Sequence, residues 1–246
     1  MPGSTDIDAV ATSQPTAVDQ HNAADNSLQV AGKPTPTPLT SAERARCATL
    51  YLVRHGETEW NTKDILQGHL DSALTERGLA QARALVDRFR DVEFTAIFSS
   101  DVTRAQRTAE IIALERKMAV GTNKLLRERN WGRYDGVAAQ RYRDECKELI
   151  ARYNQLSREQ RWSFKFFDDI ESFEEIFTRF LTFLREVAAA HAGHNVLCVT
   201  HLDVLGALLL KLGYSPVGIS NMAWVKLLSD GSLMQVDETG GIEFAQ

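Results

Sequence analysis

Hydrophobic and polar positions follow two alternating patterns after about residue 47. Unbroken apolar runs occur at 49–53, 94–98 and 196–200, and such runs are typical of strands buried on both faces. Between and after these runs, apolar residues recur every three or four positions, as on the buried stripe of a helix. This spacing predicts helices that begin at about Thr75 and Val102 and others that cover about 137–155, 172–190 and 202–212.

Local signals set the ends of several of these elements. Thr75 is placed to cap the first helix, and Ser172 with Glu175 forms a capping box before the apolar stripe of another. Near the end of the chain, the runs 224–228 and 233–236 flank Asp230-Gly231, which is a hairpin turn signal. Buried strands that alternate with helices predict an α/β fold, with a mostly parallel sheet covered by helices on both faces.

The first 46 residues lack this pattern. Five of the six prolines lie within the first 38 residues, and every Phe, Tyr and Trp comes after residue 50. A segment rich in Ala, Thr, Ser and Pro buries too little apolar surface to offset the entropy of ordering it. We therefore expect residues 1–46 to be a disordered tail and residues 47–246 to form a single domain.

The overall charge argues against two classes of partner. The chain has 28 Lys and Arg against 33 Asp and Glu, a formal net charge of −5, and it has no basic cluster suited to nucleic acid or to anionic lipid. The three cysteines form no metal-binding pair, and residues 1–30 contain no apolar run of a secretion signal. We expect a cytoplasmic protein with no nucleic-acid or membrane partner; no feature indicates its oligomeric state.

The chemistry-bearing residues follow the three predicted strands directly. The first strand ends in Arg54-His55-Gly56, the second is followed one helical turn later by Arg104, and the third ends in Thr200-His201. In parallel sheets, the carboxyl ends of strands meet at one edge, where ligands bind. Arg matches phosphate oxygens with a bidentate fork, so this cluster predicts a pocket for a phosphorylated ligand.

The same segments carry a specific resemblance. YLVRHGETEWN (51–61) resembles the signature of the histidine phosphatase superfamily, the phosphoglycerate mutase-like proteins, and four further blocks continue the resemblance in the family's order. These blocks are LQGHLDSALTERGLAQA (66–82), FSSDVTRAQRTAEII (98–112), LRERNWGRYDG (126–136) and VTHLDVL (199–205). Together the blocks span most of the predicted domain.

The resemblance implies a role for each matching residue. It implies that His55 is the nucleophile that becomes a phosphohistidine, and that Glu128 donates a proton to the leaving oxygen. It further implies that the transferred phosphoryl group is surrounded by Arg54, Arg104 and His201, with hydrogen-bond donors from Asn61 and Thr58. Gln67 and Gly68 belong to a segment that resembles a substrate-facing loop.

Physical chemistry agrees with these roles. Phosphoryl transfer needs positioning and neutralisation of spread negative charge, which fixed guanidinium and imidazole groups supply without a metal or cofactor. The attacking nitrogen of His55 must be neutral, so we expect its other ring nitrogen to donate to a backbone carbonyl near Gly56.

Three functions remain open within the resemblance. Glu128 and His201 are 73 residues apart, a short separation that favours the phosphatase branch over mutases with a longer insertion. We therefore expect a metal-independent, acid-type phosphatase acting on a small phosphorylated metabolite, with a cofactor-dependent phosphoglycerate mutase as the alternative. A second alternative is a phosphate-binding homologue with weak catalysis. Leu202 follows His201 where the family has a small residue, and it either packs into the sheet or narrows the pocket.

Overall fold

The fold of this chain is given by a computed structural model that describes residue 34 and residues 37–245. The predicted disorder of residues 1–33 and 35–36 lies outside the described residues. Within the described part of the predicted tail, residues 41–46 form a helix, α2 (Ser41–Arg46), which the sequence pattern did not predict. Thr40 and Glu43 close a capping box at its first turn, and the first strand begins two residues after it.

Six strands of the described chain form one mixed sheet. Its order is β3-β2-β4-β1-β5-β6, in which β1 to β4 run parallel and β5 and β6 are antiparallel to their neighbours. The strands are β1 (Ala48–Arg54), β2 (Phe94–Ser99), β3 (Val120–Thr122), β4 (Asn195–Thr200), β5 (Pro216–Ser229) and β6 (Met234–Phe244). The mostly parallel α/β architecture predicted from the sequence is therefore confirmed.

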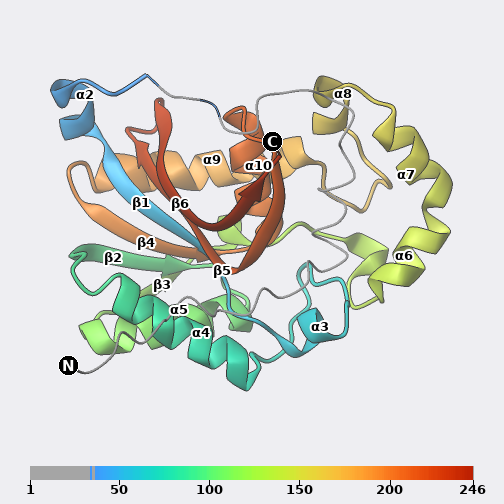
Figure 1. The fold of residues 1–246 in the computed structure, drawn as a ribbon, viewed down its shortest axis with the longest axis horizontal. Coiled ribbons are helices and arrows are strands. Elements are labelled where there is room, and N and C mark those ends of the chain that lie inside the picture. The colour runs from blue at the N-terminus through green and yellow to red at the C-terminus, as the bar shows by residue number, and fades with distance from the viewer. Residues whose placement is uncertain (1–33, 35–36, 246) are drawn as a thin grey trace, which may run out of the picture.

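Helices cover both faces of this sheet (Figure 1). On one face, α4 (Glu76–Arg88) and α5 (Thr103–Arg116) pack over a cluster that includes Val53, Ile97 and Val199. On the other face, α9 (Phe173–Ala190) and α10 (Leu202–Lys211) pack over a larger cluster that includes Leu52 and Cys198. Alternate residues of the same strands thus enter opposite cores, which explains why these strands are apolar throughout.

Most predicted elements occur where the pattern placed them. Thr75 caps α4, the capping box of Ser172 and Glu175 begins α9, and Gly231 in the turn between β5 and β6 has φ of 91°. The helix predicted over 137–155 is divided at Cys146 into α6 (Ala139–Glu145) and α7 (Lys147–Asn154). The short elements were not predicted, because they span too few residues to show a period: β3, α3 (Glu59–Thr62), α8 (Arg158–Trp162) and two 3₁₀ turns, Lys124–Leu126 and Gly132–Tyr134.

A third apolar cluster supports the loops at the carboxyl ends of the strands. Trp131, Tyr134, Tyr142 and Phe166 form its centre, and their rings meet edge to face with centroids 5.0–5.9 Å apart. In Figure 1, α6, α7 and α8 lie together at one end of the molecule, beside the sheet. Packing within this cluster holds in place the segment between the 3₁₀ turns and α9.

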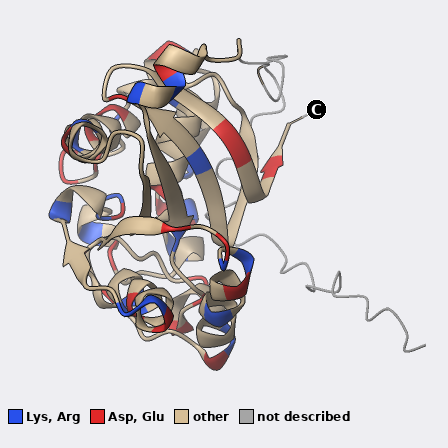
Figure 2. Cartoon of the chain, turned by 90° about the vertical axis from the view of Figure 1, so that its left-hand side faces the viewer, with Lys and Arg blue, Asp and Glu red and all other residues tan. Residues whose placement is uncertain are grey.

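Charged side chains are spread over the molecule. Figure 2 shows Lys and Arg beside Asp and Glu on both helices and strands of the face in view. No helix within the described residues is long and apolar enough to cross a membrane.

The chain leaves β1 through a close contact between two glycines. A Cβ atom on Gly56 would lie 2.7 Å from the carbonyl oxygen of Gly78, and one on Gly78 would overlap the carbonyl oxygen of Glu57. The loop that follows His55 therefore rests on the first turn of α4 at a distance that only glycine permits.

We expect Gly78→Ala to destabilise the fold by about 1–3 kcal/mol, since the added methyl group must displace backbone rather than a flexible side chain. The shift in the midpoint of urea-induced unfolding measures this change. Ala80→Ser, at an exposed position of the same helix, is the control and should change the free energy of unfolding by less than about 0.5 kcal/mol. Equal midpoints for the two variants would contradict the close contact.

Candidate active site

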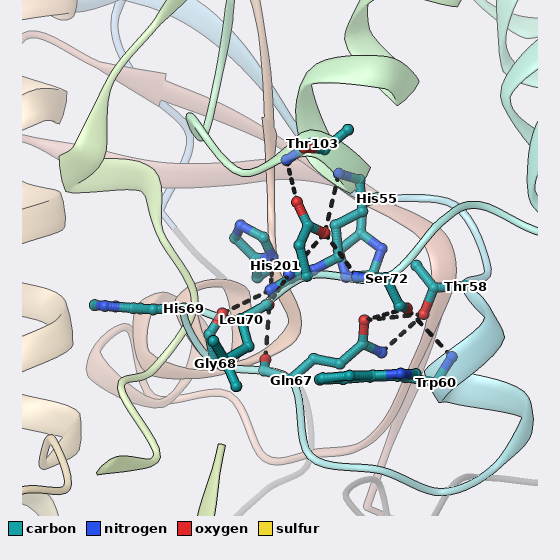
Figure 3. A network of polar contacts seen from close by, with 12 residues as sticks. His55, Thr58, Trp60, Gln67, Gly68, His69, Leu70, Ser72, Thr103 and His201 are labelled. Carbon is teal, nitrogen blue, oxygen red and sulfur yellow. Dashed lines mark hydrogen bonds and ion pairs between the residues drawn. The ribbon is translucent and has the colours of Figure 1, made fainter. Parts of the chain in front are cut away.

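The ends of two neighbouring strands bring two histidines together. Arg54 on β1 is in register with Thr200 on β4, and the backbone N–H of His55 donates to the carbonyl of Thr200 at 3.0 Å. The rings of His55 and His201 consequently meet edge to face, with centroids 5.2 Å apart (Figure 3). Both histidines are buried.

One ring nitrogen of His55 is fixed by its own loop. Nδ1 lies 2.8 Å from the carbonyl oxygen of Gly56. A carbonyl oxygen only accepts, so Nδ1 carries the hydrogen and Nε2 presents its lone pair. Burial, together with the positive charges of Arg104 and Arg54, holds the pKa of His55 well below its ordinary value. The imidazole is therefore neutral, with the hydrogen-bonded carbonyl that the sequence led us to expect.

His201 has the opposite arrangement. Nη2 of Arg104 lies 3.4 Å from Nδ1 of His201, and a guanidinium only donates. Nδ1 therefore accepts and the hydrogen lies on Nε2, which has no hydrogen-bond partner among the described residues. Burial and the charge of Arg104 keep the pKa of His201 well below its usual value. The pair thus offers one lone pair, on His55, and one N–H donor, on His201.

Arg104 lies in the first turn of α5, and its side chain is fully buried. Its guanidinium donates to the carbonyls of Gly68, at 2.8 Å, and Leu70, at 2.7 Å. Both residues belong to the loop that is drawn as sticks in Figure 3. Asp71 completes the site: it accepts from Nη1 of Arg104 at 3.2 Å and from the backbone N–H groups of Thr103 and Arg104. The Asp71 carboxylate thus orients the Arg104 guanidinium and also accepts hydrogen bonds from backbone N–H groups in the first turn of α5, which have no partner within the helix.

Arg54 is oriented by a part of the chain that the sequence did not single out. Nη1 of Arg54 donates to the carbonyl of Ile219 on β5. The pairing of β5 with β6 shifts between Ile219 and Trp224, and this irregular stretch also carries Asn221. The Asn221 amide donates to the carbonyl of His55 at 3.2 Å and to Oδ1 of Asn61 at 3.3 Å. No local motif marked Asn221, because its position depends on this irregular sheet pairing.

Glu128 reaches the site from the loop after β3. Its carboxylate accepts from the backbone N–H groups of Leu202 and Asp203, both at 3.1 Å, and of Arg129 at 2.8 Å. Glu128 is buried, and burial with the nearby charge of Asp203 raises its pKa to about 8, despite these hydrogen bonds. Glu128 is therefore protonated at neutral pH and can donate a proton.

Arg179 on α9 and Glu171, which precedes that helix, form an ion pair that holds the backbone around Glu128. Arg179 donates to three backbone carbonyls of that loop: those of Leu125 at 2.9 Å, Arg127 at 2.6 Å and Glu128 at 3.0 Å. Nε of Arg179 also donates to Glu171 at 2.9 Å, and Glu171 accepts from the backbone N–H of Asn130 at 2.8 Å. No sequence pattern marked this role of Arg179, since an Arg in a helix most often faces solvent.

The remaining predicted residues divide into two groups. Asn61 and Gln67 line the pocket beside His55 and Glu128, whereas Thr58 and Gly68 are not among its lining residues. Thr58 caps α3, and its hydroxyl is hydrogen-bonded to Asn61. The same hydroxyl is hydrogen-bonded to the side chain of Gln67 (Figure 3). Gly68 supplies the carbonyl that Arg104 binds. These two residues support neighbouring groups of the site.

Leu202 lies both in the core and at the pocket. Its side chain belongs to the large apolar cluster under α9 and α10, and the residue also borders the pocket. Its backbone N–H binds Glu128. The complete lining also contains residues that the sequence did not mark: Asp64, Ile65, Trp131 and Asp203.

The donor set of the pocket suits an anion better than a metal ion. Within residues 37–245, no three side chains from His, Cys, Asp and Glu lie where they could share a metal ion. The Arg54 guanidinium lines the pocket, whereas the buried Arg104 and His201 side chains lie next to His55 but are not among the lining residues. Guanidinium and ring N–H donors match the oxygens of a phosphoryl group.

The sequence pattern of the histidine phosphatase superfamily (branch 1) matches residues 50–241. The chain belongs to this family. The match includes Arg54, His55, Arg104, Glu128 and His201.

Relatives of this superfamily member carry the names of two activities. A "Putative phosphoserine phosphatase 2" of Hydrogenobacter thermophilus is 31% identical over 191 residues, 78% of this chain and 90% of that protein. "Phosphoglycerate mutase-like protein 4" of Arabidopsis thaliana is 34% identical over 163 residues, 65% of this chain and 69% of that protein. The chain is therefore similar to proteins named as phosphatases and to proteins named as mutases.

Two solved structures share the fold. YhfR of Bacillus stearothermophilus has 30% identity and a TM-score of 0.68, covering 77% of this chain and 95% of that one. A phosphoglycerate mutase of Bacillus anthracis has 27% identity and a TM-score of 0.70, covering 81% of this chain and 95% of that one.

Proposed function

We propose that this protein is a phosphatase that hydrolyses a small phosphomonoester through a phosphohistidine on His55. The observation that carries the proposal is that the two neutral histidines use Nδ1 in opposite ways: Nδ1 of His55 donates a hydrogen bond, and Nδ1 of His201 accepts one. Gly56 leaves the Nε2 lone pair of His55 available for attack, and Arg104 leaves an N–H of His201 available to a phosphoryl oxygen.

In the first step, Nε2 of His55 attacks phosphorus and the bond between phosphorus and the ester oxygen breaks. Protonated Glu128 gives its proton to the departing oxygen, so an alcohol leaves rather than an alkoxide. The charges of Arg54 and Arg104 and the ring N–H of His201 stabilise the charge on the equatorial oxygens, and this electrostatic contribution replaces that of a metal ion.

In the second step, Glu128 is a carboxylate and accepts a proton from water. The resulting hydroxide attacks phosphorus, the N–P bond breaks, and inorganic phosphate leaves while His55 returns to its neutral form. Glu128 suits both steps because its raised pKa, about 8, lies close to neutral pH.

Phosphate release and isomer exchange distinguish hydrolysis from mutase chemistry. With a panel of small phosphomonoesters we expect steady release of inorganic phosphate, measured colorimetrically. With phosphoglycerates we expect no exchange between the 2- and 3-isomers, measured by NMR. Rapid isomerisation that depends on 2,3-bisphosphoglycerate would show the mutase instead, and release of no phosphate from any ester would support a phosphate-binding homologue.

A further inference from the structure

The backbone that follows His55 is held by side chains from two helices and a strand. The tautomer of His55 depends on this backbone, because Nδ1 donates to the carbonyl oxygen of Gly56 at 2.8 Å. Glycine permits more backbone conformations than other residues, so contacts of the neighbouring peptide groups must set the direction of this carbonyl.

The peptide group between His55 and Gly56 is bound at both ends. Its carbonyl oxygen accepts from the side-chain amide of Asn221 on β5, at 3.2 Å. Its N–H donates to Oγ1 of Thr108, a buried residue of α5, at 3.2 Å. The Thr108 hydroxyl donates in turn to the carbonyl of Arg104 at 2.8 Å, which leaves its oxygen free to accept from Gly56.

The next peptide group, between Gly56 and Glu57, contains the carbonyl that binds His55. Its N–H donates to Oε1 of Gln81 on α4, at 2.9 Å. A backbone N–H only donates, so the Gln81 amide presents its oxygen at this point. This second peptide group is therefore also held at both ends, by Gln81 at its N–H and by His55 at its carbonyl.

The contribution of β5 includes an uncommon backbone conformation. Met222, next to Asn221, has φ of 62°, in the left-handed region that residues with a long side chain seldom adopt. Its backbone N–H donates to the carbonyl of His55 at 3.4 Å, and its side chain packs in the cluster under α4 and α5. Such a conformation persists where surrounding contacts impose it, and it is frequent at functional sites.

We propose that Thr108 and Gln81 are positioning residues that select the tautomer of His55. Through the two peptide groups they hold the Gly56 carbonyl against Nδ1, which keeps the lone pair of the ring on Nε2. Neither residue is among those that line the pocket, so both act through the backbone. The expected effect on turnover rests on the proposed phosphatase activity, whereas the tautomer can be measured without a substrate.

The tautomer is read from the ¹⁵N NMR signals of the His55 ring at neutral pH, since a nitrogen that carries hydrogen and one with a lone pair resonate in separate ranges. His55→Ala identifies these signals by their loss. We expect the hydrogen on Nδ1 in wild-type protein. In Thr108→Val and Gln81→Leu, which remove the accepting oxygen but keep the approximate size of the side chain, we expect a population with the hydrogen on Nε2.

The kinetic readout is hydrolysis of p-nitrophenyl phosphate. We expect each variant to lower kcat about 10–100-fold, since a reacting group that is misplaced by about 1 Å can cost this much. KM should change less than about threefold, because the guanidinium groups of Arg54 and Arg104 remain to bind the phosphoryl group.

Two matched variants serve as controls. Thr108→Ser keeps the hydroxyl and should keep the wild-type tautomer and kcat. Gln106→Leu makes the same exchange as Gln81→Leu at a glutamine of α5 that binds the Glu110 side chain, and it should also change neither quantity. Thr108→Val also removes a hydrogen bond to the Arg104 carbonyl, whereas Gln81→Leu leaves that bond intact, so either variant alone is a sufficient test.

The two readouts separate failure of this inference from failure of the proposed function. If kcat falls while the hydrogen stays on Nδ1, the two residues only support the fold and the proposal is overturned. Unchanged tautomer and kcat in both variants would overturn it too, and the phosphatase would stand as long as wild-type protein releases phosphate. If wild-type protein hydrolyses no phosphomonoester, the proposed function is wrong, and the tautomers of the variants still decide the role of Thr108 and Gln81.

Discussion

His55→Ala is expected to lower the rate of phosphate release by at least about 10⁴-fold, because loss of a nucleophile removes the covalent route altogether. The remaining residues would still bind the substrate, so KM should change far less than kcat. A discontinuous phosphate assay over hours measures the residual rate. His191→Ala is the matched control: it removes an imidazole at the end of α9 and should keep the wild-type rate.

The covalent intermediate gives a direct check on the same variant. After brief exposure to radiolabelled substrate, wild-type protein and His191→Ala should carry acid-labile, base-stable phosphate, whereas His55→Ala should carry none. Phosphate on His55→Ala, or turnover near the wild-type rate, would contradict the assignment of His55 as the nucleophile.

Glu128→Gln is expected to reduce kcat/KM for alkyl phosphates by about 10²–10⁴-fold, the range typical of a lost general acid. Glutamine keeps the shape of the side chain but has no proton to transfer. The reduction should be much smaller for p-nitrophenyl phosphate, whose phenolate leaves without a proton. A comparable loss for both esters would mean that Glu128 only holds the surrounding backbone in position and does not donate a proton.

The pH dependence supplies a second measurement for Glu128. Its pKa is raised to about 8, so the proton donor is present below that pH and is lost as the pH rises through it. kcat/KM for an alkyl phosphate should therefore fall above about pH 8 in wild-type protein, and this fall should disappear in Glu128→Gln. The lowered pKa of His55 keeps the nucleophile neutral through pH 6.5, so its protonation should cause no loss there. A decline centred near pH 4.5 instead of 8 would contradict the raised pKa.

The sequence by itself determined the strands other than β3, most of the long helices and the family. Runs such as 49–53 and 196–200 are apolar because both faces of the sheet are covered, and the capping box of Ser172 and Glu175 acts within four residues. Arg54, His55, Arg104 and His201 lie at strand ends or within one helical turn of them, so the rule that parallel strands share a carboxyl edge was enough to group them. These signals lie within short stretches of the chain, so one sequence is enough to recognise them.

Only the tertiary structure decided how those residues are oriented and charged. The carbonyl that binds Arg54 lies 165 residues away at Ile219, and the N–H groups that bind Glu128 lie 74 and 75 residues away on α10. The pKa of Glu128 depends on burial and on Asp203, which no spacing rule pairs with it. Orientation and protonation depend on distances of a few ångströms between segments far apart in the chain, and only packing sets such distances.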